Sequence, residues 1–190
     1  MKDTNSWGVS SARKAIQDDN NWDRAFTKCL YRPFDIRPIF YHEALIERGR
    51  PEVMRHMLAG ENVALISMRQ VAQNEPYSHF GVARVIVDNR AFYSNRGIQC
   101  LFPLYLYPAE GEMQFEGGKR RPNLNPEFIK EFSEKLGLTF VEDGKGNLEE
   151  TFGPEDIFNY AYAIFHSPTY RKRYTEFLKI DFPRLPLTSD

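Results

Sequence analysis

The sequence predicts a mixed α/β (α+β) fold with a central, mostly buried sheet and packed C-terminal helices. Short apolar runs typical of buried strands occupy the middle of the chain, at residues 62–70, 83–88 and 97–108. Amphipathic stretches with helical spacing lie before and after these runs, and several begin at a proline. The 190 residues are 42% hydrophobic and 27% charged, a balance that allows one continuous core.

In the first third of the chain, two helices and one short strand are expected. Residues 1–21 are polar and are expected either to join the domain to an upstream part or to lie on the surface. Apolar residues then recur at helical spacing over residues 22–30. Two prolines and clustered aromatic residues indicate a turn before a short strand at residues 39–41. Pro51 opens the next helix, and Gly60 is expected to cap its end. The apolar side of that helix consists of Val53, Met54, Met57 and Leu58.

In the middle third, three strands are expected, with the sequences NVALISMRQ, ARVIVD and GIQCLFPLYLYP. Pro103 interrupts the last of them. Because proline cannot donate a ladder hydrogen bond, it indicates an edge position or a bulge. Residues 110–125 contain Gly, Pro and Asn at the density of a loop.

In the last third, three helices are expected. Asn125 and Pro126 begin the first, which Gly137 ends, and the second begins at Gly153–Pro154. Ser167 caps the third after a corner at His166. The core face of the third helix is expected to consist of Tyr170, Tyr174, Phe177 and Leu178. Three basic residues should therefore point largely away from the core, to phosphates, to a neighbouring domain or only to solvent: Arg171, Lys172 and Arg173.

Composition and charge exclude several classes of protein. Cys29 and Cys100 lie far apart and fit neither a disulfide framework nor a zinc site, so a reducing cytoplasm is the expected compartment. The N-terminus lacks the apolar core of a signal peptide, and no apolar run approaches the roughly 20 residues of a membrane span, so no membrane association is expected. The net charge of -1 gives no general attraction to polyanions, and nucleic-acid binding would depend on local clusters of Lys and Arg.

Three blocks, in order along the chain, carry a resemblance to a known family: LYRPFDIRPIFYHEALIERGRPEVMRHML, FPLYLYP and PEDIFNYAYAIFHSPTYRKRYTEFLKIDFPRLP. They resemble the C-terminal target-recognition (specificity) domain of type ISP restriction-modification enzymes and of related adenine-methyltransferase restriction enzymes. The resemblance covers about residues 30–187. It implies that residues 31–190 read double-stranded DNA, and that residues 1–30 are a helical lead-in or linker from an upstream methyltransferase domain.

The resemblance also implies that the catalytic parts lie outside this chain, in a covalently linked or associated methyltransferase domain and in nuclease parts. S-adenosylmethionine is expected in that upstream domain, and no cofactor is expected here. The closest string to an adenine-methyltransferase motif is NPEF, at residues 125–128, which is better explained as a helix start. No catalytic and no metal-binding residue is therefore predicted.

Two other functions stay open. The segment EDGKGN places Asp143 and Lys145 in the D-x-K arrangement of a metal-dependent nuclease, although Asp-Gly and Gly-Asn are also ordinary turn sequences. The second alternative is a protein-interaction module that holds a methyltransferase and a motor domain together, which the near-neutral charge favours. The histidines are scattered singly and offer no ligand set: His42, His56, His79 and His166.

Polar loops next to strands supply the candidate DNA-binding residues. Arg pairs with guanine and Asn or Gln with adenine, whereas flexible basic loops suit phosphates. The loop after the strand at residues 62–70 supplies Arg69, Gln70, Gln73, Asn74 and Ser78. The segment DNRAFYSNRGIQ supplies Asn95 and Arg96, besides Asn89, Arg90 and Ser94. The glycine-flanked loop supplies Lys119, Arg120 and Arg121. For any single residue among these, plain solvation of a polar loop is the alternative.

Overall fold

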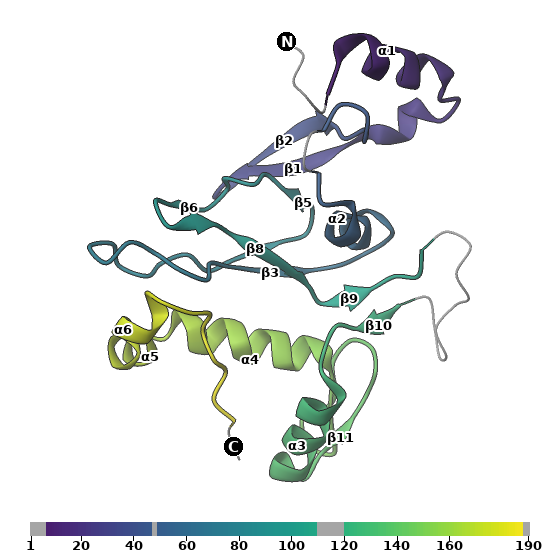
Figure 1. The fold of residues 1–190 in the computed structure, drawn as a ribbon. Helices are drawn as coiled ribbons and strands as arrows, with labels where there is room; N and C mark the ends of the chain where they lie inside the picture. The colour runs from purple at the N-terminus through teal and green to yellow at the C-terminus, as the bar shows by residue number, and fades with distance from the viewer. Residues whose placement is uncertain (1–6, 47–48, 110–119, 188–190) are drawn as a thin grey trace.

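The computed structural model describes residues 7–46, 49–109 and 120–187 and confirms a mixed α/β domain (Figure 1). Small sheets form the upper and middle parts of the molecule in Figure 1, and the C-terminal helices lie beneath them. Within the described residues, no helix is long and apolar enough to cross a membrane. The buried sheet expected as one unit consists of two three-stranded sheets and additional two-stranded pairs.

The first sheet has the strand order β2–β1–β5. β1 (Phe26–Arg32) and β2 (Asp35–Phe40) form an antiparallel hairpin, and β5 (Ile86–Val87) pairs with β1 in parallel. The chain therefore returns to its N-terminal hairpin after more than fifty residues, and this pairing fixes the hairpin to the rest of the domain.

The helix predicted over residues 22–30 is wrong. Within these residues, the only helical part is a short 3-10 helix, η1 (Trp22–Ala25), and β1 follows it directly. Cys29 and Leu30 match a helical repeat, but both are buried because they lie on opposite faces of the central strand. Cys29 packs beside α2 (Pro51–Leu58), and Leu30 packs in a separate apolar cluster. β1 runs across residue 30, where the sequence predicts the boundary between the lead-in and the recognition domain. The division into these two parts stays a prediction.

The second sheet has the strand order β4–β3–β8. The strand predicted at residues 83–88 belongs to both sheets: its first residue ends β4, and its fourth and fifth residues form β5. Residues 84–85 carry the chain from one sheet to the other. Pro103 lies in β8, at the sheet edge, as its missing N–H predicts. The bounds of this sheet are β3 (Ala64–Ser67), β4 (Gly81–Ala83) and β8 (Cys100–Pro103).

The other strands form short pairs. β7 and β9 flank β8, so the predicted strand at residues 97–108 consists of three pieces. The pairs are β6 (Tyr93–Ser94) with β7 (Gly97–Ile98), β9 (Tyr105–Leu106) with β10 (Arg121–Pro122), and β11 (Thr139–Phe140) with β12 (Thr151–Phe152).

Helix ends follow the predicted capping in the C-terminal half. The Asn125 side chain accepts a hydrogen bond of 2.7 Å from Glu127 N, and Gly137 adopts φ 68° after the helix. In α2, by contrast, the predicted cap at Gly60 is wrong, because Ala59 ends the helix. A Cβ on Gly60 would lie 2.7 Å from the Tyr107 hydroxyl. The remaining helices are α1 (Val9–Asp18), α3 (Pro126–Leu136), α4 (Pro154–His166), α5 (Pro168–Arg173) and α6 (Thr175–Leu178).

The corner between α4 and α5 forms where Ser167 caps the new helix by accepting a hydrogen bond from Tyr170 N. The single helix predicted beyond this point is interrupted at Tyr174, whose φ of -106° and ψ of 19° are not helical. Arg171 was expected to point outward, and this expectation is wrong. Its Nε donates to Phe165 O over 2.7 Å, and its Nη2 lies 3.0 Å from His166 Nδ1. Arg171 therefore ties α5 to the end of α4, whereas Lys172 and Arg173 are exposed.

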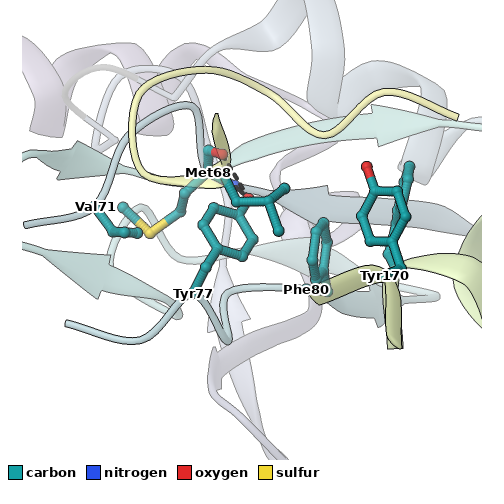
Figure 2. Packing of buried hydrophobic residues seen from close by; sticks show 7 residues of the cluster. Met68, Val71, Tyr77, Phe80 and Tyr170 are labelled. Carbon is teal, nitrogen blue, oxygen red and sulfur yellow. Dashed lines mark hydrogen bonds between the residues drawn. The ribbon is translucent and has the colours of Figure 1, made fainter. Parts of the chain in front are cut away.

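One apolar cluster joins this corner to the loop after β3 (Figure 2). The Tyr77 hydroxyl donates to Met68 O over 2.6 Å and thereby holds the start of the loop. Tyr174 was expected in this core but is 38% exposed, with its ring 4.8 Å from the ring of Tyr170. The buried members of the cluster are Met68, Val71, Tyr77, Phe80, Phe165, Tyr170 and Leu178. The loop after β3 is therefore anchored to α4, α5 and α6 through these buried side chains.

We expect this corner to weaken in acid. Burial and the neighbouring Arg171 guanidinium lower the pKa of His166. As the pH falls through the unfolded-state pKa of about 6.5, the unfolded chain takes up the proton first, so the free energy of unfolding should decrease below that pH. Denaturant unfolding at about pH 7.5 and pH 5.5 measures the change. His166→Asn keeps an acceptor for Arg171 and should show a smaller decrease, whereas an equal decrease would assign the effect to other groups, such as His79.

Candidate nucleic-acid interface

Two of the segments that supply predicted DNA-binding residues lie side by side. They are the loop after β3, at residues 69–79, and the β6–β7 hairpin at the left of Figure 1. Ala72 N donates a hydrogen bond of 3.1 Å to Ser94 Oγ, and His79 Nε2 lies 3.3 Å from Tyr93 O. We call the surface formed by residues 69–79 and 88–97 the loop edge.

Five of the predicted residues offer free side chains on the loop edge. All are exposed, and their side chains form no hydrogen bond or ion pair with the part of the chain that the structure describes. They are Gln73, Asn74, Ser78, Asn95 and Arg96. Because the loops that carry them are fixed by buried Ser94 and Tyr77, these amide, hydroxyl and guanidinium groups are held on a rigid support.

Arg69 and Gln70, the two predicted residues closest to β3, contact the segment after α6. Arg69 Nε lies 3.4 Å from Asp181 Oδ1, and Gln70 Nε2 donates to Ile180 O over 3.3 Å. Val71 N donates to Lys179 O in the same place. The Arg69 side chain is still 67% exposed, and an exposed ion pair of this kind is weak. The predicted role of Arg69 and Gln70 in reading bases stays a prediction.

Arg120 lies on the other side of the domain, next to β10 at the right of Figure 1. Its Nε and Nη2 donate to Asp143 Oδ1 over 2.9 and 2.7 Å, and its Nη1 donates to Glu61 O over 2.7 Å. The guanidinium carbon lies 3.7 Å from the centroid of the Tyr105 ring, and burial raises the pKa of Tyr105 to about 12. These contacts make Arg120 a structural link between the loop before β3 and the turn after β11.

Lys119 and Arg121, the other two residues predicted in the glycine-flanked loop, are not part of the loop edge as the structure describes it. Arg121 is exposed in β10, and Lys119 lies outside the described residues. The nine predicted residues that the structure describes are therefore divided between two sides of the domain.

The same contacts bear on the nuclease alternative. Asp143 is paired with Arg120, and Gly144 adopts φ 69°, as in a tight turn. Among the described residues, no group of three or more His, Cys, Asp or Glu side chains could hold a metal ion. The segment with Asp143 and Lys145 is thus a turn that anchors Arg120.

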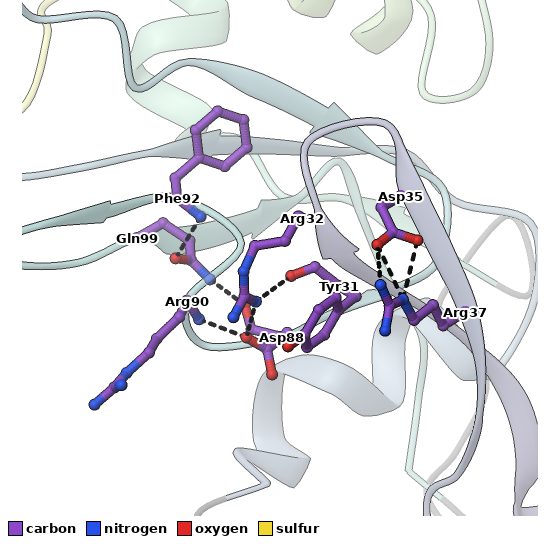
Figure 3. Close-up of polar contacts among 8 residues, drawn as sticks. All are labelled: Tyr31, Arg32, Asp35, Arg37, Asp88, Arg90, Phe92 and Gln99. Atoms are coloured by element: carbon purple, nitrogen blue, oxygen red, sulfur yellow. Dashed lines mark hydrogen bonds and ion pairs between the residues drawn. The ribbon is translucent and has the colours of Figure 1, made fainter.

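A further arginine-rich group lies on the β1–β2 hairpin (Figure 3). The Tyr31 ring contacts Arg32 and Arg37, whose guanidinium carbons lie 3.9 and 4.2 Å from its centroid. Arg32 Nη1 donates to Asp88 Oδ1 over 3.0 Å, and Arg37 Nη2 lies 2.7 Å from Asp35 Oδ2. Tyr31, Arg32 and Arg37 are not among the DNA-binding residues predicted from the sequence. The available signal was the alternation of aromatic residues and arginines in YRPFDIR.

Hydrogen bonds connect this hairpin to the loop edge. Asp88 Oδ1 also accepts from Arg90 N over 2.9 Å, so one carboxylate holds both the hairpin and the turn after β5. Gln99, which is buried, donates to Asp88 O and accepts from Phe92 N over 3.2 Å (Figure 3). These hydrogen bonds therefore join the hairpin to the turn after β5 and to the segment that leads into β6.

Several solved structures share this fold, and one family model matches the sequence. No curated protein matches the chain. In solved structures, a DrdV–DNA complex matches with 23% identity and a TM-score of 0.65, over 94% of this chain and 15% of the other. The Type ISP restriction-modification enzyme LlaBIII bound to DNA matches with 22% identity and a TM-score of 0.62, over 95% of this chain and 11% of the other.

A nuclease-deletion mutant of the Type ISP enzyme LlaGI, in complex with a DNA substrate mimic, matches with 19% identity and a TM-score of 0.57. That match covers 95% of this chain and 14% of the other. The chain thus spans 11% to 15% of the length of these three proteins, which share its fold. The family model described as the Type ISP C-terminal specificity domain matches residues 1–190. Because that match spans the whole chain, the protein belongs to the family of Type ISP C-terminal specificity domains.

Proposed function

We propose that this domain binds double-stranded DNA and selects the sequence at which a restriction-modification enzyme acts. The observation that carries the proposal is the match of the whole chain to a specificity-domain family. It is supported by three solved relatives, each described as bound to DNA or to a DNA mimic. In this proposal, the domain supplies recognition and no catalytic group.

The loop edge is suited to this task. Base edges in the major groove are read by donors and acceptors held on rigid supports, and Arg96, Asn95 and Gln73 are exposed groups of that kind. Lys172 and Arg173 are exposed on α5 and suit phosphates, which carry charge but no sequence information.

The rest of the enzyme belongs to the same proposal. An adenine-specific methyltransferase domain, covalently linked or associated, would hold S-adenosylmethionine and modify the selected site, and a nuclease would cut. The solved relatives, several times longer than this chain, leave room for such parts.

Binding by this domain alone should be weak and sensitive to salt. When the logarithm of the binding constant is plotted against the logarithm of the salt concentration, each phosphate contact adds about -0.9 to the slope. Titrating a duplex at several salt concentrations measures that slope. A tight complex indifferent to salt would contradict a phosphate-contacting surface, and the absence of any duplex binding would favour the protein-interaction alternative.

Plasmid DNA incubated with the chain and magnesium should remain intact. The nuclease alternative depends on Asp143, which is paired with Arg120. Gel electrophoresis of the plasmid after incubation decides the matter. Cleavage that disappears in Asp143→Ala would overturn the assignment of catalysis to other parts of the enzyme.

A further inference from the structure

The tip of the β1–β2 hairpin carries a residue that neither packing nor backbone geometry explains. Arg32 pairs with Asp35, so Pro33 and Phe34 are the two central residues of the turn. Proline at the first position and a φ of 66° at Phe34 fit a type II turn, whose second position favours glycine. The Phe34 side chain is also fully exposed, with a relative accessibility of 102%. A glycine would be less strained here and would expose no apolar surface.

Two arginines flank this tip, and each is paired with a carboxylate, Arg32 with Asp88 and Arg37 with Asp35. The register shifts between Leu30 and Arg32, which leaves Tyr31 as the extra residue of a β-bulge. The bulged Tyr31 ring contacts the guanidinium groups of Arg32 and Arg37, one from each strand. Bulges re-aim side chains and are frequent beside functional sites. The arginines beside Phe34 are therefore fixed in place before any partner binds.

The hairpin tip is connected to the loop edge, the surface proposed to contact DNA. Asp88 connects Arg32 to Arg90, and Gln99 connects the same turn to Phe92, the residue before β6, so hydrogen bonds join the base of the hairpin tip to the loop edge that carries Arg96. A protruding aromatic ring between arginines matches the side chains that wedge between base pairs, where the ring stacks on bases and cations contact the adjacent phosphates.

We propose that Phe34 inserts its ring into the base stack of the bound duplex, with Arg32 and Arg37 directed to the flanking phosphates. This inference rests on the proposed function, because it requires that the domain binds DNA. It adds a contact that distorts the duplex and lies apart from the donors of the loop edge. Separation of two base pairs by Phe34 makes sequences with easily unstacked steps easier to bind.

Phe34→Gly tests the side chain without loss of the fold, because glycine suits the positive φ at this position. The thermal midpoint of the variant should not fall, and its affinity for duplex DNA should decrease by about 5- to 150-fold, as for loss of one stacked ring. Phe34→Trp should retain the affinity of the original chain. Leu148 offers a matched control, since it is also exposed (63%) with φ 61°, in the turn before β12. Leu148→Gly should bind like the original chain.

Insertion is distinguished from simple contact by a second duplex that carries one abasic site and is otherwise identical. Because a base is missing at the abasic site, the ring can enter the stack there without separating two stacked bases. The original chain should therefore bind this duplex about tenfold more tightly than the intact one, and Phe34→Gly should show no preference. If Phe34→Gly binds the intact duplex as tightly as the original chain, the inference is overturned and the tip is free for a protein partner. If it binds more weakly but keeps the preference, the ring contacts DNA without insertion. Failure of the original chain to bind any duplex would reject the proposed function itself.

Discussion

Replacing Phe165 with alanine is expected to lower the free energy of unfolding by about 3–5 kcal/mol. Phe165 is only 4% exposed, and its ring lies 4.9 Å from Phe80 and 5.8 Å from Tyr170. It therefore connects three parts of the chain, namely α4, α5 and the segment before β4. Truncation removes buried apolar surface and leaves a cavity between elements that cannot all move inward.

Urea or guanidinium unfolding followed by circular dichroism measures this change. Tyr162→Ala is the matched control, because Tyr162 is an aromatic residue on the same helix but is 39% exposed. Its truncation should cost clearly less than that of Phe165. If the midpoint of Phe165→Ala hardly moves, the corner between α4 and α5 does not contribute to the common core. The loop edge would then lack the support that the apolar cluster gives it.

The helices of the C-terminal half could be predicted because their ends are determined locally. Asn125 with Pro126, Gly137 and Ser167 with Pro168 act within a few residues of the helix that they begin or end. β1 could not be predicted in the same way, because Cys29 and Leu30 are buried by partners that are distant in sequence. The division of residues 83–88 between two sheets also depends on the distant strands β1 and β3.

The candidate site shows a similar limit. The sequence identified the polar segments that form the loop edge, since such loops are the usual location of binding residues. It could not show that Arg120 is held by Asp143 and Glu61, or that Arg171 is held by Phe165, because these partners appear only in the folded chain. The hairpin arginines were missed because a turn rich in proline and aromatic residues was interpreted only by its backbone.

Arg96→Ala is expected to remove about 1–3 kcal/mol of discrimination at one base pair, which is about 5- to 150-fold in selectivity. The Arg96 side chain is exposed and forms no hydrogen bond or ion pair with the described residues. Its backbone N lies 3.4 Å from buried Ser94 Oγ, which holds the β6–β7 turn in place. The guanidinium can therefore contact a guanine edge from a fixed position, and its loss should affect one position of the target sequence.

Arg173→Ala provides the comparison, since Arg173 is exposed on the surface of α5 and its only side-chain interaction with the described part of the chain is with the Tyr174 ring, at 5.8 Å. As a phosphate contact, it should weaken binding about equally on all sequences and reduce the salt slope by about one unit. The assay is modification by the full-length enzyme of a substrate library with single-base changes, read out for each variant. A variant at Arg120 is less informative, because it also breaks the contacts with Asp143 and Glu61. If Arg96→Ala keeps the original site preference while Arg173→Ala relaxes it, the residues that read bases lie on α5 and not on the loop edge.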